Sequence, residues 1–451
     1  MVRMNQGQLP GALAAFNASI AISSKLAHTE PANVARQVAW SRTLAFVGLI
    51  HYEQGELDGA LRNWQTAHTL LQPALKRAPD SMPLLEQLVF LDNDIAHVLD
   101  ADGQPHAALA IFQERLQLAT RLARAKPHDS DYVAGLGAAH NDLGKLALQR
   151  GDLATTIAEY LADDAIETRL LARDPKDNTQ RDNMLATRAV LGRTLLAVGN
   201  LRLSEDYLNE SVAGYSDLTK HDPGNDDDQR ELGLYSSQLA RTQRLSGAAQ
   251  AAASLSAKAV AILANLTRKS TGDDEYRLRY AEAMTEQAAE AYAGGSKGAA
   301  RKQGTAALAI LGPMLSKHPN RRDTLLATVT AKLLLASVMA DPKSAQSLRE
   351  QSLQAIQATK VNQDDPRLLA LEVHALLTLD RTVDARPLIE RLWHEGYCDP
   401  GFVALLKRNR IAYPMNVPFA QKIATVMKTA RARTALQAGA DRVAGDTTTH
   451  R

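Results

Sequence analysis

Long segments with apolar residues at helical spacing recur along the chain, and a glycine follows each of them. Proline marks the loops between successive units, and because proline cannot continue a helix, the next helix must begin after it. An Asp or Asn beside several of these prolines can cap that next helix. The pattern therefore predicts a repeated unit of helix, glycine turn, helix and proline loop. The glycines are Gly7, Gly55, Gly103, Gly151, Gly199, Gly247 and Gly295, always 48 residues apart. The loop positions are Pro31, Pro79, Pro127, Pro175, Pro223, Thr271 and Pro319, on the same spacing.

Small residues also keep this period, one inside each helix of the unit. They allow two helix backbones to approach closely, and a bulky residue four positions after the second small one fills the space beside them. We expect these positions to be the contact between the two helices of a unit. In the first helices they are Gly48, Ala96, Gly144, Gly192, Ala240, Ala288 and Ala336. In the second helices they are Ala60, Ala108, Thr156, Ser204, Ala252 and Ala300, with Trp64, Phe112, Tyr160 and Leu208 as the bulky residues of the early units.

The order Leu143-Gly144, Thr156, Tyr160, Pro175 resembles the tetratricopeptide repeat. That family's unit has about 34 residues, so a 48-residue unit is 14 longer, or about two extra helical turns in each helix. The resemblance covers roughly residues 1–400. It implies an all-α fold, a right-handed superhelical solenoid of antiparallel helix pairs. HEAT and armadillo units of about 40–47 residues are closer in length but lack this spacing of small and aromatic residues.

The period divides the chain into four parts. Residues 1–30 form a partial first repeat with only its second helix, at 9–29, and residues 31–365 form the array of long helices. Residues 366–415 hold a final repeat of 34 residues, from Pro366 to Pro400, and a capping helix. Residues 416–451 form a basic, partly disordered tail with a possible helix at 418–435.

The helix at 9–29 carries an apolar face without a complete partner helix, and terminal repeats need a polar outer surface. We expect this face to self-associate or to bind a partner domain, and we expect the given start to lie inside a longer protein. The face consists of Leu9, Ala12, Leu13, Phe16 and Ile20.

The segment 393–409 closes the array with the pattern Gly-Tyr-x-x-Pro-x-Phe-x-x-Leu-Leu, from Gly396 to Leu406. Long repeats followed by such a segment resemble the C-terminal regions of bacterial signalling proteins, including serine/threonine kinases and winged-helix regulators. This resemblance implies the sensory or interaction part of a signalling system. The alternative is a C-terminal fragment of such a kinase or regulator, with its catalytic or DNA-binding domain upstream. The chain itself contains no kinase motif.

Composition narrows the possible partners. The 52 Lys and Arg residues nearly balance the 50 Asp and Glu residues, so the net charge gives no general attraction to nucleic acid or to an anionic membrane. We found no signal peptide and no long uncharged apolar run, and the single cysteine, Cys398, cannot form an intrachain disulfide. We therefore expect a cytoplasmic protein that binds neither nucleic acid nor membrane.

Motifs for catalysis or metal binding are missing from the sequence, including H-E-x-x-H, C-x-x-C and G-x-S-x-G. Carboxylate pairs such as Asp92 and Asp94 are expected on helix surfaces, where they serve solubility. The sequence thus predicts no enzyme, no cofactor and no metal site, but a scaffold that binds a peptide or partner domain in a concave groove.

Amide and cationic residues recur beside the small residue of the first helices, on the side that faces the groove in tetratricopeptide proteins. Such donors suit an acidic peptide, since Arg can bind a carboxylate with two hydrogen bonds. The alternative is that they are solvated charges balanced by Asp94 and Asp142. The candidate peptide-binding residues are Asn93, His97, Asn141, Lys145, Arg193, Arg241 and Arg244.

Overall fold

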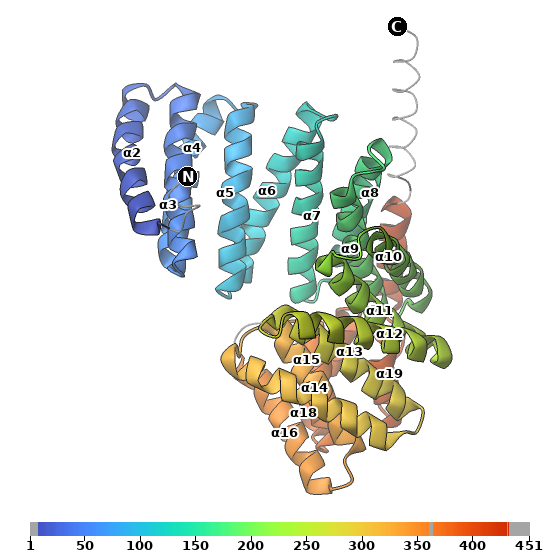
Figure 1. Cartoon of the computed structure of the whole chain (residues 1–451). Coiled ribbons are helices and arrows are strands. Elements are labelled where there is room, and N and C mark those ends of the chain that lie inside the picture. The colour runs from blue at the N-terminus through green and yellow to red at the C-terminus, as the bar shows by residue number, and fades with distance from the viewer. Residues whose placement is uncertain (1–7, 360–363, 431, 433–451) are drawn as a thin grey trace, which may run out of the picture. The chain divides into compact units, whose positions relative to one another are not determined.

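The computed structural model describes residues 8–359, 364–430 and 432 of the chain (Figure 1). The regular elements within these residues are helices, and no strand occurs among them. The chain forms two compact units, Met1–Leu146 and Ala147–Arg451, which we call unit 1 and unit 2. The expectation of an all-α solenoid of helix pairs is confirmed.

Unit 1 contains α2 and two complete helix pairs, and the first helix of the next pair crosses its boundary. Its helices are α2 (Leu9–Thr29), α3 (Val34–Glu53), α4 (Leu57–Arg77), α5 (Met82–Ala101), α6 (Pro105–Ala125) and most of α7 (Ser130–Gln149). Residues 1–7, where the sequence suggests the end of a preceding helix, lie outside the described residues.

Unit 2 continues the series of pairs and ends in shorter helices. Its helices are α8 (Leu153–Arg173), α9 (Asn178–Ala197), α10 (Leu201–His221), α11 (Asp226–Ser246), α12 (Ala249–Lys269), α13 (Asp274–Ala293), α14 (Lys297–Lys317), α15 (Arg322–Val338), α16 (Pro342–Ala358), α17 (Pro366–Thr378), α18 (Thr382–His394) and α19 (Pro400–Arg408). Residues 417–430 are also helical.

The glycine turns and the proline loops lie where the period predicts them. Gly55, Gly103, Gly151, Gly199, Gly247 and Gly295 all have φ between 76° and 92°, a left-handed conformation that favours glycine. After the proline positions, the side chains of Asp177, Asn225 and Asp273 cap α9, α11 and α13 by accepting backbone N–H bonds.

The predicted contact between the paired helices is also confirmed. The second-helix residues Ala60, Ala108, Thr156, Ser204 and Ala252 are fully buried. A Cβ added to Gly192 would lie 2.7 Å from Cγ of Leu208 and 3.1 Å from the backbone oxygen of Ser204. The small residues therefore let each pair close, as in tetratricopeptide repeats.

In unit 2 the first helices of successive pairs contact one another. These contacts join α9 to α11, α11 to α13, α13 to α15 and α15 to α17. The second helices α10, α12, α14 and α16 each pack on the first helices before and after them. The first helices thus form an inner layer and the second helices an outer one.

The structure adds detail at both ends of the array. In the basic tail predicted for residues 416–451, Phe419, Ile423, Val426 and Met427 pack on a cluster from α8, α9 and α10. An apolar spacing of three and four residues gives this helix a buried face. The possible helix at 418–435 is confirmed over 418–430, and residues 433–451 lie outside the described part.

The apolar face predicted to lack cover on α2 is partly buried. Ala12 is 2% exposed, and the ring of Phe16 stacks on Phe46 of α3 with 5.2 Å between centroids. The exposed large side chains of α2 are instead Ile22 and Leu26. Self-association through residues 9–29 stays a prediction.

One described helix, α12, is long and apolar enough to cross a membrane by length and composition alone. Its apolar character comes largely from alanine, and it occupies the second-helix position between α11 and α13. This is weak evidence for a membrane span, because a helix in a soluble array meets the same criterion.

Candidate binding site

The inner layer of unit 2 contains a cavity with a water-accessible volume of about 340 Å³. All five first helices of this unit contribute to it, through Arg193 of α9, Gln238 of α11, Glu286 of α13, Thr330 of α15 and Arg367 of α17. The loop between α18 and α19 adds Tyr397 and Asp399, and Arg241 of α11 completes the charged lining. We call this cavity the arginine pocket.

Most of the charges around the arginine pocket are already paired. Arg241 donates to Asp399 at 2.8 Å, and Arg367 donates to the buried carboxylate of Asp365 at 2.6 Å. Outside the lining, Arg244 donates to Glu286 through two nitrogens, at 2.6 Å and 3.0 Å. These pairs fix the walls of the pocket and satisfy their own charges.

Arg193 differs from the other arginines of the pocket. Within the described residues its guanidinium has no hydrogen bond and no ion pair. Burial in the pocket, and the nearby positive charge of Arg367, both lower the pKa of Arg193. The negative charge of Asp323 offsets these effects only in part, so the arrival of an anion beside this buried cation is favoured.

Tyr397 and Asp399 in the wall of the pocket come from the closing segment of the array. The Cys398 backbone N–H donates to the carbonyl of Ala197, the last residue of α9, at 2.7 Å. Asp399 caps α19 by accepting from Gly401 N–H at 2.9 Å, and the same carboxylate pairs with Arg241. This segment therefore closes the inner layer onto α9 and α11, a contact that the sequence analysis did not predict.

The seven predicted site residues fall into two groups. Arg193, Arg241 and Arg244 belong to unit 2, where the structure brings Arg193 and Arg241 into one pocket. Asp399 and Glu286 already engage Arg241 and Arg244, so fewer of their donors remain for a ligand. Asn93, His97, Asn141 and Lys145 belong to unit 1 and line no part of the arginine pocket.

In unit 1, Asn93 and His97 lie beside carboxylates. Asn93 donates to Asp94 at 3.0 Å, and the ring of His97 packs edge-on against Phe112 with its Nε2 3.5 Å from Asp142. Asn141 is half-buried, and Lys145 is exposed. Local balancing by Asp94 and Asp142, which the sequence left open, therefore describes Asn93 and His97.

Sequence reasoning missed Arg367, Tyr397 and Asp399. Arg367 lies in the final short repeat, where the 48-residue frame no longer applies, and Tyr397 and Asp399 come from a loop. The Gly-Tyr-x-x-Pro pattern marked the segment but not its contacts.

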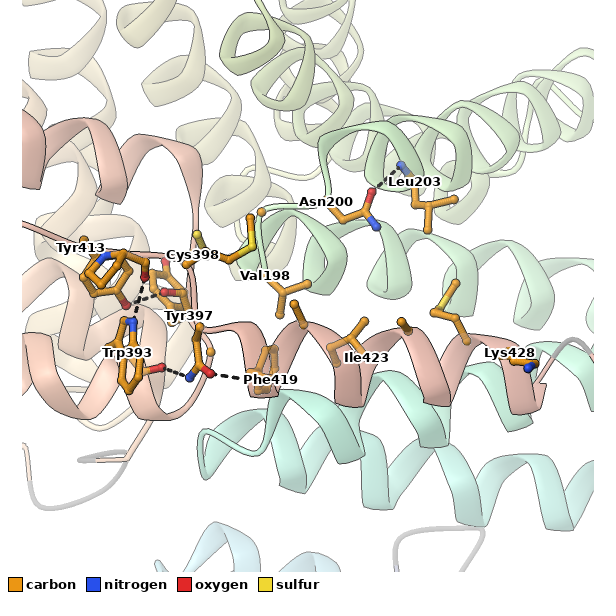
Figure 2. A pocket seen from close by; sticks show the side chains of 18 residues that line it. Val198, Asn200, Leu203, Trp393, Tyr397, Cys398, Tyr413, Phe419, Ile423 and Lys428 are labelled. Carbon is orange, nitrogen blue, oxygen red and sulfur yellow. Dashed lines mark hydrogen bonds between the residues drawn. The ribbon is translucent and has the colours of Figure 1, made fainter.

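A second cavity of unit 2, with a water-accessible volume of about 590 Å³, lies between the α9–α10 turn, the α18–α19 loop and residues 413–428 (Figure 2). Its polar groups mostly bond to each other: Trp393 Nε1 donates to the carbonyl of Pro414 at 2.8 Å, and the Tyr413 hydroxyl donates to the carbonyl of Tyr397 at 2.6 Å. Burial raises the pKa of the Cys398 thiol, which keeps it protonated. This apolar cavity thus offers few groups for specific recognition.

The paired helices, glycine turns and inner layer of first helices define the class: a tetratricopeptide-like helical-repeat protein. No protein-family model matches the chain, and no curated protein matches it.

Solved structures with a similar arrangement of helices include the quorum sensor NprR from B. thuringiensis, at 11% identity and a TM-score of 0.47, over 88% of this chain and 99% of that one. A tetratricopeptide repeat protein from Parabacteroides merdae aligns at 14% identity and a TM-score of 0.37, over 72% and 98% of the two chains. Human IFIT1, solved as a dimer with m7Gppp-AAAA, aligns at 13% identity and a TM-score of 0.38, over 88% and 90%.

Proposed function

We propose that this protein is an interaction scaffold, and not an enzyme, that holds a carboxylate-bearing peptide segment of a partner protein in the arginine pocket. The observation that carries the proposal is Arg193, whose guanidinium lines the cavity and forms no ion pair within the described residues. Its place on the inner layer is where helical-repeat proteins bind extended ligands.

A ligand carboxylate would form an ion pair with Arg193, which has none within the described residues. It would also screen the repulsion between Arg193 and Arg367. A guanidinium offers parallel N–H donors that match the two oxygens of a carboxylate. Thr330 and Gln238 provide further polar groups, and Leu326 and Leu371 provide apolar wall, so the pocket suits an acidic side chain flanked by an apolar one.

The test uses fluorescent peptides with alternating Glu and Leu residues, and matched peptides in which Gln replaces Glu. We expect the full chain to bind the acidic peptide and not the amide peptide in fluorescence anisotropy. Arg193→Gln should weaken acidic-peptide binding by at least about 30-fold, or ~2 kcal/mol, because a desolvated charge pair is lost. Equal binding of both peptides, or equal affinity of Arg193→Gln and the wild type, would contradict the proposal.

Arg202→Gln is the matched control. Arg202 lies on an outer helix, α10, with a side chain that is 89% exposed, and its nearest carboxylate is 3.9 Å away. This variant removes the same charge from the outer layer and should leave the affinity unchanged. A labelled single-stranded RNA, measured at two salt concentrations, tests the nucleic-acid alternative, since phosphate binding would weaken steeply with salt.

A role in a bacterial signalling system in the cytoplasm is the finer part of this proposal. The closing segment 393–409 supports it, since the structure gives that segment a wall of the pocket through Tyr397 and Asp399. Identification of a signalling protein that requires Arg193 for binding would support this role, and a partner from another process would refute it.

A further inference from the structure

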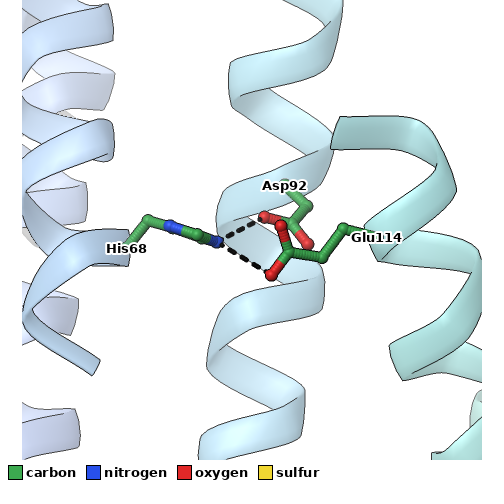
Figure 3. A group of neighbouring side chains, drawn as sticks. All are labelled: His68, Asp92 and Glu114. Atoms are coloured by element: carbon green, nitrogen blue, oxygen red, sulfur yellow. Dashed lines mark ion pairs between the residues drawn. The ribbon is translucent and has the colours of Figure 1, made fainter. Parts of the chain in front are cut away.

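Three side chains from consecutive helices of unit 1 converge on one point (Figure 3). They are His68 of α4, Asp92 of α5 and Glu114 of α6, and one ligand atom from each lies within 4.8 Å of the others. Nε2 of His68 is 3.2 Å from Oδ1 of Asp92 and 3.4 Å from Oε1 of Glu114. No short sequence motif marks this cluster, because its members are 22 to 24 residues apart.

Asp92 is the unusual member of the cluster. We expected it on a helix surface, but its side chain is 0% exposed, and neither carboxylate oxygen accepts a hydrogen bond within the described residues. Its ion-pair contact within the described residues is with His68 Nε2, at 3.2 Å, and a buried carboxylate is unfavourable unless a cation neutralises it. The carboxylate points toward His68 and Glu114, so a neutralising cation would lie among these three groups.

The repeat supplies an internal comparison. Two repeat lengths later, 96 residues on, the positions of His68, Asp92 and Glu114 are occupied by Asp164, Arg188 and Glu210. There Arg188 contacts Asp164 at 2.8 Å and Glu210 at 3.0 Å, which are ordinary distances for charge-assisted hydrogen bonds. In that second cluster the arginine itself is the cation between two carboxylates.

The contacts of His68 are longer than those of Arg188. With zinc bonds of about 2.0–2.2 Å, two ligand atoms of a tetrahedral site are roughly 3.4 Å apart. The distances of 3.2 Å and 3.4 Å from Nε2 fit two edges of such a site, and the Gln72 amide nitrogen also lies 3.2 Å from Nε2.

We propose that His68, Asp92 and Glu114 bind a divalent transition-metal ion of the zinc type, with one imidazole nitrogen and two carboxylates as ligands. This ligand set is one that Zn²⁺ and Co²⁺ accept, and the two carboxylates balance the charge of the ion. The Glu114 side chain is 35% exposed, which gives the ion a route from solvent. The bound ion would link α4, α5 and α6, and so would join two successive repeats of unit 1.

The experiment titrates Co²⁺ into the chelator-treated full chain and follows the visible absorption of the ion. We expect saturation at one strongly absorbing ion per chain, displacement by Zn²⁺, and a higher melting temperature of the zinc-loaded protein. Glu114→Gln and His68→Gln should each weaken binding at least about tenfold, since each removes a ligand.

Glu210→Gln is the matched control, the same substitution at the equivalent position of the arginine-centred cluster, and it should leave metal affinity unchanged. Circular dichroism checks that each variant keeps its helix content. The inference is overturned if the wild type shows no saturable binding, or if His68→Gln and Glu114→Gln bind Co²⁺ as the wild type does. In either case the cluster is an ion pair held by a proton on His68.

Discussion

At the residue scale, the fold tolerates several buried polar groups, and Glu167 on α8 is the clearest case. Its side chain is 3% exposed, and Oε2 has no hydrogen-bond partner within the described residues. Burial, together with the negative charges of Asp163, Asp164 and Asp177, raises the pKa of Glu167 to about 8. The carboxyl group is therefore protonated in the folded chain at neutral pH.

This residue makes stability depend on pH in a defined direction. The pKa of Glu167 is raised from its ordinary 4.5 to about 8 in the folded state, so its contribution is fully present below pH 4.5 and is lost as pH rises to 8. Glu167→Gln cannot ionise and should remove this loss, raising the free energy of unfolding at pH 8 by ~2 kcal/mol after allowance for solvent screening.

Urea unfolding of wild type and variant at pH 5 and pH 8 measures the effect. The same substitution at the exposed Glu53 on α3 serves as control. An equal effect of Glu167→Gln at pH 5 and pH 8 would show that the carboxyl group does not titrate in this range.

The 48-residue period places Glu167 within a second helix of a repeat, but it does not predict which charged groups surround its side chain. Asp163 and Asp164 are neighbours on the same helix, whereas Asp177 reaches it from the next loop. The prediction that Asp92 lies on a helix surface was wrong for the same reason. The 48-residue period predicts where each helix lies, but not which neighbours a polar side chain faces.

At the scale of the helix pair, more of the structure could be predicted from the sequence than at the scale of single side chains. The interactions within a pair are local and recur in every unit. Turn glycines, cap residues and small contact residues each act within one unit, so the period alone places them. The prediction becomes weaker where the repeat shortens, as in α15 and α16, which are 17 residues long instead of 20 or 21.

The contact between helices of a pair can be tested at Gly192. Gly192→Ala should destabilise the protein by ~1–3 kcal/mol, because its Cβ would overlap Leu208 and the backbone of Ser204. Gly135→Ala on α7 is the control, since a Cβ there meets nothing within 4 Å and should add up to ~1 kcal/mol of helix propensity. Thermal unfolding followed by circular dichroism compares the two, and a stabilised Gly192→Ala would mean that the pair is looser than described.

At the scale of the molecule, the arginine pocket depends on contacts that no local pattern encodes. Arg241 and Asp399 are 158 residues apart, and the hydrogen bond of Cys398 to Ala197 joins residues that are still farther apart in the sequence. The sequence identified Arg193 and Arg241 as candidates from their repeated position. It could not foresee that Asp399 would pair with Arg241 while Arg193 forms no ion pair within the described part of the chain.

Reversal of the charge at Arg193 tests directly whether this side chain binds the acidic residue of the ligand. Two peptides are compared: the acidic peptide that binds the wild type, and the same peptide with Lys in place of Glu. We predict that Arg193→Glu no longer binds the acidic peptide and instead binds the Lys peptide, which the wild type does not bind. The reason is that the side chain at this position contacts the ligand charge itself. If Arg193→Glu still bound the acidic peptide as the wild type does, or bound neither peptide while retaining its helix content, the arginine pocket would not be the peptide site.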